Sequence, residues 1–140
     1  MTLPMILAPL FVLVLMTFVI GTILAAMRVP PLTRGEVRPE TVSLRQPNWP
    51  PRALQVGYSF QNQFELPVLF YVLIALALPL RHADLAIVLL SWVFVLTRII
   101  HAGIFVTSND VRSRSLAWFA GAIVLLIMWI WFAIGVLVGV

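Results

Sequence analysis

Long apolar stretches alternate with short polar ones along the chain. Four apolar runs reach the roughly 20 residues that a membrane-crossing helix needs; they are residues 4–27, 53–80, 84–106 and 115–139. Because lipid offers backbone N–H and C=O groups no partners, each run is predicted to be helical. The pattern therefore predicts an all-α integral membrane protein, a bundle of four transmembrane helices, with residues 1–140 as one domain.

Polar residues concentrate in two connections that four spans place on the same side of the membrane. Residues 28–52 hold five arginines and six prolines, so this connection is predicted to be extended or looped. Residues 107–114 hold two more of the nine arginines and a Ser-Asn-Asp sequence typical of a helix end. By the positive-inside rule both connections are expected to be cytoplasmic and both termini outside the cytoplasm.

Composition narrows the class of protein. Hydrophobic residues make up 62% of the chain and charged residues 10%, with a mean hydropathy of +1.08, which indicates a lipid-bilayer protein. The absence of cysteine excludes disulfides and cysteine nucleophiles, and two distant histidines offer no metal-binding spacing. The net charge of +4 comes from loop arginines, so no nucleic-acid partner is expected.

The first apolar run lacks the positive n-region of a signal peptide, which favours a first membrane span over a removed signal. With its arginine-rich loops, the chain is compatible with a bacterial inner membrane, the location we expect, and also with an endoplasmic-reticulum membrane.

The second run opens with amides and one carboxylate. Tyr58, Asn62 and Glu65 fall on one helical face, with Gln61 beside them. Pro67 removes a backbone N–H, so a kink is predicted just after this polar turn. The run is longer than the hydrocarbon needs, and its first turns are expected to project past the cytoplasmic interface. The polar residues expected near the headgroups are Ser59, Gln61, Asn62 and Gln63.

A carboxylate inside an apolar run needs a partner, because an ionisable group there costs on the order of 2.5–3.5 kcal/mol. Arg98 and His101, one turn apart in the third run, are the candidates for pairing with Glu65 at similar depth. A buried Glu65–Arg98 ion pair with Asn62 beside it would be purely structural, and His101 has a structural interpretation too.

Arg114 and Ser115 open the fourth helix on the same side. Asp110 or Ser113 is expected to cap that helix, whose positive end adds to the Arg114 charge and favours an anion. Arg114 by itself, like Arg28 at the end of the first helix, also has a simple interpretation as a positive-inside residue.

The order Asn62-x-x-Glu65, Arg98-x-x-His101 and Arg114-Ser115 resembles the MAPEG superfamily, the membrane-associated proteins in eicosanoid and glutathione metabolism. Size, four spans and the long first connection extend the resemblance over essentially the whole chain. It implies a homotrimer that binds glutathione at the cytoplasmic side, between neighbouring subunits.

The resemblance also implies roles for individual residues. Arg114 would hold the glutathione thiolate in catalysis with Ser115 next to it. The cofactor-binding positions would be Arg28, Asn62, Glu65, Arg98 and His101. Lipophilic electrophiles would be the substrates of such a transferase or peroxidase.

Three positions depart from the glutathione-using pattern. Tyr58 and Gln61 stand where that pattern has arginines, and Phe105 stands where it has tyrosine. Losing two charge-assisted hydrogen bonds, at roughly 1.5–3 kcal/mol each, weakens the expected binding of glutathione. Two functions therefore stay open: a glutathione-dependent transferase or peroxidase, and a non-catalytic MAPEG-fold protein whose polar residues form a structural network. A small transporter or a subunit of a larger complex is a third, weaker alternative.

Overall fold

The computed structural model describes residues 1–45 and 47–139, and every regular element in this part is a helix. The six helices are α1 (Leu3–Thr33), α2 (Pro39–Val42), α3 (Pro51–Asn62), α4 (Leu66–Ala77), α5 (Leu85–Val106) and α6 (Val111–Val138). Four segments are long and apolar enough to span a membrane: α1, α3 together with α4, α5, and α6. The predicted fold class is thus confirmed. The domain predicted over residues 1–140 includes Gln46 and Val140, which lie outside the described residues.

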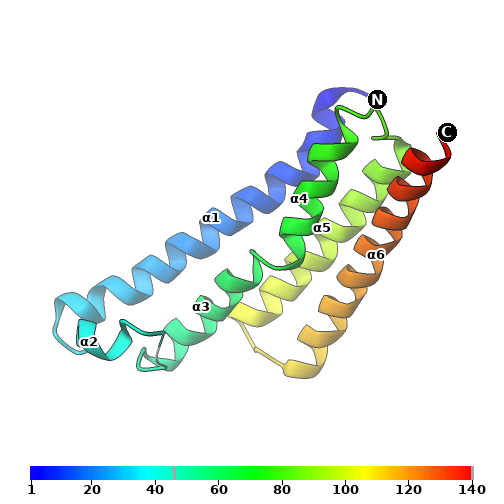
Figure 1. Cartoon of the computed structure of the whole chain (residues 1–140). Coiled ribbons are helices and arrows are strands. Elements are labelled where there is room, and N and C mark those ends of the chain that lie inside the picture. The colour runs from blue at the N-terminus through cyan, green and yellow to red at the C-terminus, as the bar shows by residue number, and fades with distance from the viewer. Residues whose placement is uncertain (46, 140) are drawn as a thin grey trace.

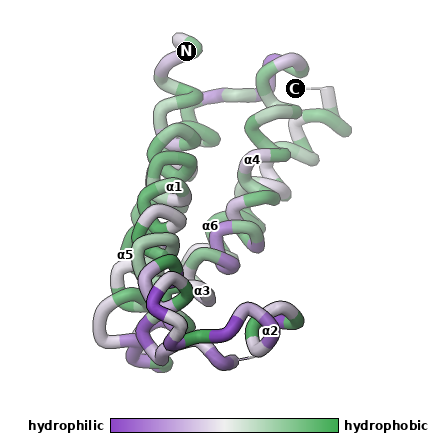
Figure 2. Tube along the Cα trace, turned by 90° about the vertical axis from the view of Figure 1, so that its left-hand side faces the viewer, coloured by the Kyte–Doolittle hydropathy of each residue, from purple (hydrophilic) through white to green (hydrophobic). Residues whose placement is uncertain are grey.

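The long helices run side by side, with both termini at one end of the bundle and α2 with the α5–α6 connection at the other (Figure 1). Hydrophilic residues gather at the α2 end, whereas α1 is largely hydrophobic along its length (Figure 2). The two arginine-rich connections therefore share one end, as four spans require. The assignment of this end to the cytoplasm stays a prediction.

Prolines begin helices here more than they break them. Pro39 and Pro51 stand at the starts of α2 and α3, where the missing N–H costs no intrahelical bond. The expectation that the prolines of the first connection exclude regular helix was wrong for Pro30 and Pro31, which belong to α1, and for Pro39 and Pro51, which begin helices. Pro30 and Pro31 fall in the last turns of α1, near the helix end, and a φ near −65° fits helical backbone.

The second span is broken rather than kinked. Helix α3 ends at Asn62 and α4 begins at Leu66, one residue before Pro67. The backbone N–H of Gln63 turns back to the carbonyl of Phe60 at 3.1 Å, which replaces the α-helical bond by a tighter one. The proline predicted a local distortion, and the distortion occupies the three residues before α4.

Two polar residues of α3 and its end are deeply buried inside the bundle, and their expected depth near the headgroups stays a prediction. Ser59 has no exposed surface and Gln63 is 1% exposed, because both lie on the side of the second span that faces inward. Ala53 and Val56 are buried on the same side, and the spacing of three or four residues from one to the next is that of a helix face. Helix α3 packs against α1 and α5.

Helix α5 is the central element, since it packs against α1, α3 and α6. Its buried face carries Phe94, which stacks on Phe70 of α4 with ring centroids 5.1 Å apart. Leu125 and Met128 of α6 belong to the same apolar core. Arg98, also on this face, is fully buried, so the polar site reaches into the interior of the bundle.

Large apolar side chains remain exposed along the outer faces of the helices, as a lipid environment requires. Phe18 on α1 is 71% exposed and Leu126 on α6 is 60% exposed. This outer surface and the four apolar spans support an integral, multi-pass membrane protein in contact with the bilayer.

Gly121 allows α6 to approach α5 closely, so we expect Gly121→Ala to destabilise the bundle. A Cβ there would lie 2.7 Å from Oγ1 of Thr97, a hydroxyl that donates to the carbonyl of Phe94. Overpacking of this kind costs about 1–3 kcal/mol. Thermal unfolding in detergent measures the effect, with Gly103→Ala as the control because nothing lies within 4 Å of its added methyl. Equal melting temperatures for the two variants would contradict the close packing.

Candidate functional site

The connection between α5 and α6 positions the first residues of the site. Asn109 adopts a left-handed backbone, which asparagine tolerates better than most residues. Asp110 then caps α6, accepting hydrogen bonds from the Ser113 hydroxyl at 2.5 Å and the Ser113 N–H at 2.9 Å. These bonds hold the pKa of the Asp110 carboxyl below its ordinary value. The expected cap is confirmed, and it fixes the direction in which α6 leaves the loop.

Arg114 lies in the first turn of α6, held by two contacts. Its guanidinium lies over the Phe105 ring, with Cζ 4.2 Å from the ring centroid, and donates a hydrogen bond to the side-chain oxygen of Asn109. Phe105 thus positions Arg114 with its ring face, although it lacks the hydroxyl of tyrosine. Neither contact neutralises the arginine's charge.

His101 connects α5 to α6. Its Nδ1 lies 3.0 Å from the backbone carbonyl of Arg114 and must donate, because a carbonyl only accepts. The ring also contacts Phe105 edge-on, with centroids 5.7 Å apart. Its Nε2 is buried and has no hydrogen-bond partner among the described residues. His101 therefore orients the backbone that carries Arg114.

These residues surround a pocket of about 200 Å³. Four of the predicted site residues meet in its wall, namely Asn62, His101, Arg114 and Ser115. The remaining wall is aromatic, from Phe105, Trp118 and Phe119. The wall contains an arginine and no carboxylate, so its charge suits an anion.

Asn62 joins Arg98 to Glu65. Its side-chain oxygen accepts from Nη2 of Arg98, and its Nδ2 donates to Oε2 of Glu65 at 2.9 Å. The predicted direct Glu65–Arg98 ion pair was wrong: within the described residues the ion pair that forms is Arg34–Glu36, at 3.9 Å. The break after α3 leaves Glu65 exposed, just before α4 begins. The neutral side-chain amide of Asn62 therefore links Glu65 to Arg98 in place of a direct ion pair.

Arg98 keeps unused donors. Its Nε and Nη1 are buried and have no partner in the part of the chain that the structure describes. A guanidinium has five N–H donors, so Asn62 satisfies only a small part of this group.

Arg28 lies apart from the other predicted site residues. It belongs to a second pocket of about 330 Å³ whose wall includes Arg45, Tyr58 and Gln61. Its Cζ lies 4.9 Å from the ring centroid of Trp49. Within one chain, the predicted cofactor-binding positions are therefore not brought together: Asn62 and His101 line the Arg114 pocket, Arg28 lines the second pocket, and Glu65 and Arg98 are in the wall of neither.

Sequence reasoning missed the residues that hold the loop in place. Asn109 bonds to Arg114, and Gln55 of α3 donates to the carbonyls of Phe105 and Thr107 at 2.7 and 3.1 Å. The Ser-Asn-Asp sequence was a signal for a turn, but no periodicity or spacing indicates that an amide of α3 reaches the end of α5.

The fold and this site define a class: a four-span helical membrane protein with a cationic, partly aromatic pocket at the end of the bundle where the arginine-rich connections lie. Residues 6–134 match the sequence model of the MAPEG family, so the chain belongs to the MAPEG family. Neither the curated proteins nor the solved structures include a match to the chain.

Proposed function

We propose that this protein binds a thiol cofactor, glutathione or a related compound, beside Arg114 and transfers it to lipophilic electrophiles. The observation that carries the proposal is an arginine in a pocket at the start of a helix, with no acidic partner among the described residues. An arginine and a helix N-terminus both stabilise a thiolate over a thiol. The thiolate sulfur would attack the electrophilic carbon, the S–C bond would form as the leaving group departs, and the thiol proton would pass to solvent.

The size of the pocket supports a site completed by another copy of the chain. Pockets that enclose a small ligand usually measure about 300–1,000 Å³, whereas the Arg114 pocket measures about 200 Å³. One chain would thus hold the thiol end, and the rest of the cofactor would lie against a neighbouring subunit. A homotrimer with glutathione between its subunits fits this division and the separate pocket of Arg28.

The second candidate function is a non-catalytic membrane protein. The observation that favours it is the arrangement of Asn62, Arg98 and Glu65, in which every member has an intramolecular partner. In this case these residues, with His101, serve the packing of α3, α5 and α6 and bind no cofactor.

Thermal unfolding of the detergent-solubilised protein separates the two functions. With millimolar reduced glutathione we expect a higher melting temperature, because a ligand that binds only the folded state stabilises it. Ophthalmic-type peptides that carry a methyl group in place of the thiol are the matched control and should give a smaller shift. Unchanged melting curves with both ligands, together with no conjugation of an aryl halide, would favour the non-catalytic function.

A further inference from the structure

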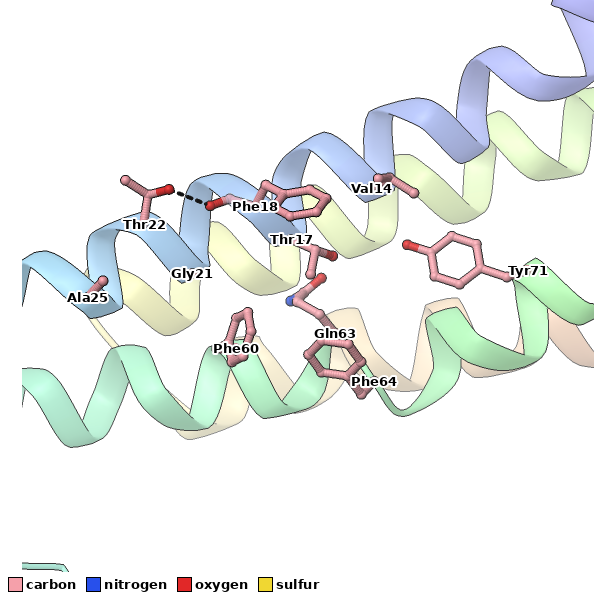
Figure 3. Close-up of a pocket in the computed structure, with 10 residues that line it drawn as sticks. All are labelled: Val14, Thr17, Phe18, Gly21, Thr22, Ala25, Phe60, Gln63, Phe64 and Tyr71. Carbon is pink, nitrogen blue, oxygen red and sulfur yellow. Dashed lines mark hydrogen bonds between the residues drawn. The ribbon is translucent and has the colours of Figure 1, made fainter. Parts of the chain in front are cut away.

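Two pockets of the bundle differ in the charges that line them. The pocket between α1 and the α3–α4 junction measures about 520 Å³, and its lining is apolar or aromatic apart from neutral polar groups (Figure 3). Another pocket, of about 420 Å³, lies where the α4–α5 connection meets the end of α6. We call it the Asp84 pocket. Its ionisable lining residues are Arg81, His82 and Asp84, so it can select a ligand by charge.

The Asp84 pocket lies at the end of the bundle that holds the two termini, opposite the arginine-rich connections (Figure 1). The rest of its lining comes from α6, namely Trp131, Phe132, Ile134 and Gly135. Trp131 and Ile134 are 51% and 54% exposed, at the end of a helix long enough to span the membrane. Lipid headgroups meet the hydrocarbon at this level. The pocket therefore suits a ligand with a polar part at the connection and an apolar part along α6.

Arg81 supplies the positive charge of the pocket. Beyond α4, the N–H of His82 donates to the carbonyl of Ala77 at 2.9 Å. The N–H of Arg81 donates to the carbonyl of Leu78 at 3.1 Å, and the two bonds form a Schellman motif. Arg81 occupies its left-handed position, with a φ of 59°, where glycine is usual and other residues are strained. The backbone conformation thus disfavours an arginine whose side chain is exposed and available to a ligand.

Asp84 supplies the negative charge. Its Oδ1 accepts a hydrogen bond from the N–H of Ile87 at 2.9 Å, and its Oδ2 accepts one from Nε1 of Trp131 at 2.8 Å. Both donors are neutral, so they fix the carboxylate without compensating its charge. A carboxylate has about four acceptor sites, so each oxygen can accept a further hydrogen bond.

The two charges line one pocket without pairing with each other. Among the described residues the ion pair that forms is Arg34–Glu36, so neither Arg81 nor Asp84 has an ionic partner there. The His82 ring packs on α6, edge-on to the Phe132 ring with centroids 6.3 Å apart. Two opposite charges that do not pair suit a zwitterionic ligand, because each of its ends then meets the opposite charge.

We propose that the Asp84 pocket binds the headgroup of a phosphoethanolamine phospholipid, with the phosphate at Arg81 and the primary ammonium at Asp84. Arginine binds phosphate oxygens through two parallel N–H bonds. A trimethylammonium group donates no hydrogen bond and a phosphoglycerol headgroup has no cation, so neither of these headgroups satisfies Asp84.

The exposed apolar side chains of α6 favour a membrane lipid over a soluble phosphate ester. Ile134 lines the pocket, and Ile130 lies one turn away on the same helix and is exposed too. Acyl chains that lie against these residues stay in the hydrocarbon while the headgroup occupies the pocket. The proposal is independent of the thiol site, because the Arg114 pocket lies at the other end of the bundle.

Competition among lipids tests the proposal on the purified full-length protein in detergent micelles. Dioleoyl lipids with phosphoethanolamine, phosphocholine and phosphoglycerol headgroups are added at equal concentrations, and native mass spectrometry measures the lipids bound per chain. We expect the phosphoethanolamine lipid to be preferred about tenfold over each of the others, the effect of one charge-assisted hydrogen bond. Equal binding of the three lipids would overturn the proposal.

Asp84→Asn and Asp110→Asn form a matched pair, because each variant removes a carboxylate that caps a helix. Asp84→Asn is expected to lower the preference for phosphoethanolamine over phosphocholine to about one, whereas Asp110→Asn, at the other end of the bundle, keeps it. A preference that persists in folded Asp84→Asn protein would contradict the assignment of the ammonium. Should this variant not fold, the comparison of the three lipids on the unmodified protein still decides the question.

Arg81→Gln tests the assignment of the phosphate. The variant is expected to weaken the binding of all three lipids roughly tenfold, because each carries a phosphate. Arg112→Gln is the control, since it removes the same charge from an exposed position at the other end of the bundle and should leave lipid binding unchanged. If Arg81→Gln alters the oligomeric state and leaves lipid binding unchanged, the pocket is a protein–protein contact and the proposal fails.

O-Phosphoethanolamine, the headgroup without acyl chains, distinguishes a lipid from a soluble phosphate ester. At millimolar concentration it is expected to leave the bound lipid in place, because it gains nothing from the apolar residues of α6. Displacement of the lipid by micromolar O-phosphoethanolamine would mean that the site takes the soluble ester, which overturns the assignment to a membrane lipid.

Discussion

Replacing Asn62 with leucine is expected to destabilise the bundle by about 1.5–3 kcal/mol, the cost of losing a hydrogen bond to a buried charged group. Arg98 is fully buried, and Asn62 is the side chain that accepts a hydrogen bond from its guanidinium. Because Asn62 also bonds to Glu65, the substitution separates the cation from the nearest carboxylate of this network. Reversible unfolding in mixed detergent micelles measures the change.

The double variant Asn62→Leu/Arg98→Leu distinguishes a buried charge from simple loss of packing. Removing both partners takes away the charge together with its acceptor, so the double variant is expected to lose less stability than Asn62→Leu alone. Gln61→Leu is the control, since this neighbouring amide is exposed and such changes stay within about 0.5 kcal/mol. Additive losses would mean that Asn62 and Arg98 do not interact.

Arg114→Ala is expected to lower the kcat of thiol conjugation by about 100- to 1,000-fold, the effect of removing one donor to an anionic centre. The variant loses the charge beside the thiolate and the contact with the Phe105 ring. The measurement is the conjugation of an aryl halide with glutathione, followed at several pH values. With the arginine removed, the pH at which the rate rises should move upward, because the thiolate is less stabilised.

Arg112→Ala is the matched control for Arg114. Arg112 is exposed in the same turn of α6 and lies outside the pocket wall, so its loss should leave the pH profile unchanged. Arg114→Lys keeps the charge but not the planar group that stacks on Phe105, and an intermediate rate is expected. Equal rates for Arg112→Ala and Arg114→Ala would remove Arg114 from the mechanism.

The number of spans and their helical nature follow directly from the sequence, because the cost of unpaired backbone in lipid leaves few alternatives. The spacing of Arg98 and His101 on one face was also sufficient to place both on the buried side of α5. Such features depend on helical periodicity and on hydrophobicity, which are properties of short segments.

The partners of Glu65 and Arg28 could not be predicted in this way. The break between α3 and α4 changes the direction in which Glu65 leaves the backbone, and no rule of spacing gives the outcome of a break. Arg28 packs on Trp49, which belongs to a proline-rich connection whose path depends on tertiary contacts. The burial of Gln63 inside the bundle was not predicted, because its polarity was considered without its position on the buried face.

The interruption between α3 and α4 also affects how this span tolerates changes in length. In a continuous helix one inserted or deleted residue rotates everything beyond it by about 100°, so that every buried side chain on one side of the change is misplaced. Residues 63–65 separate α3 from α4, so the angular phase of α4 is not inherited from α3. A change of one residue at this junction leaves the face of α3 toward α5 and the face of α4 toward α6 each in phase with its own partner. The junction is therefore a place within the second span where sequences of different length can share one bundle.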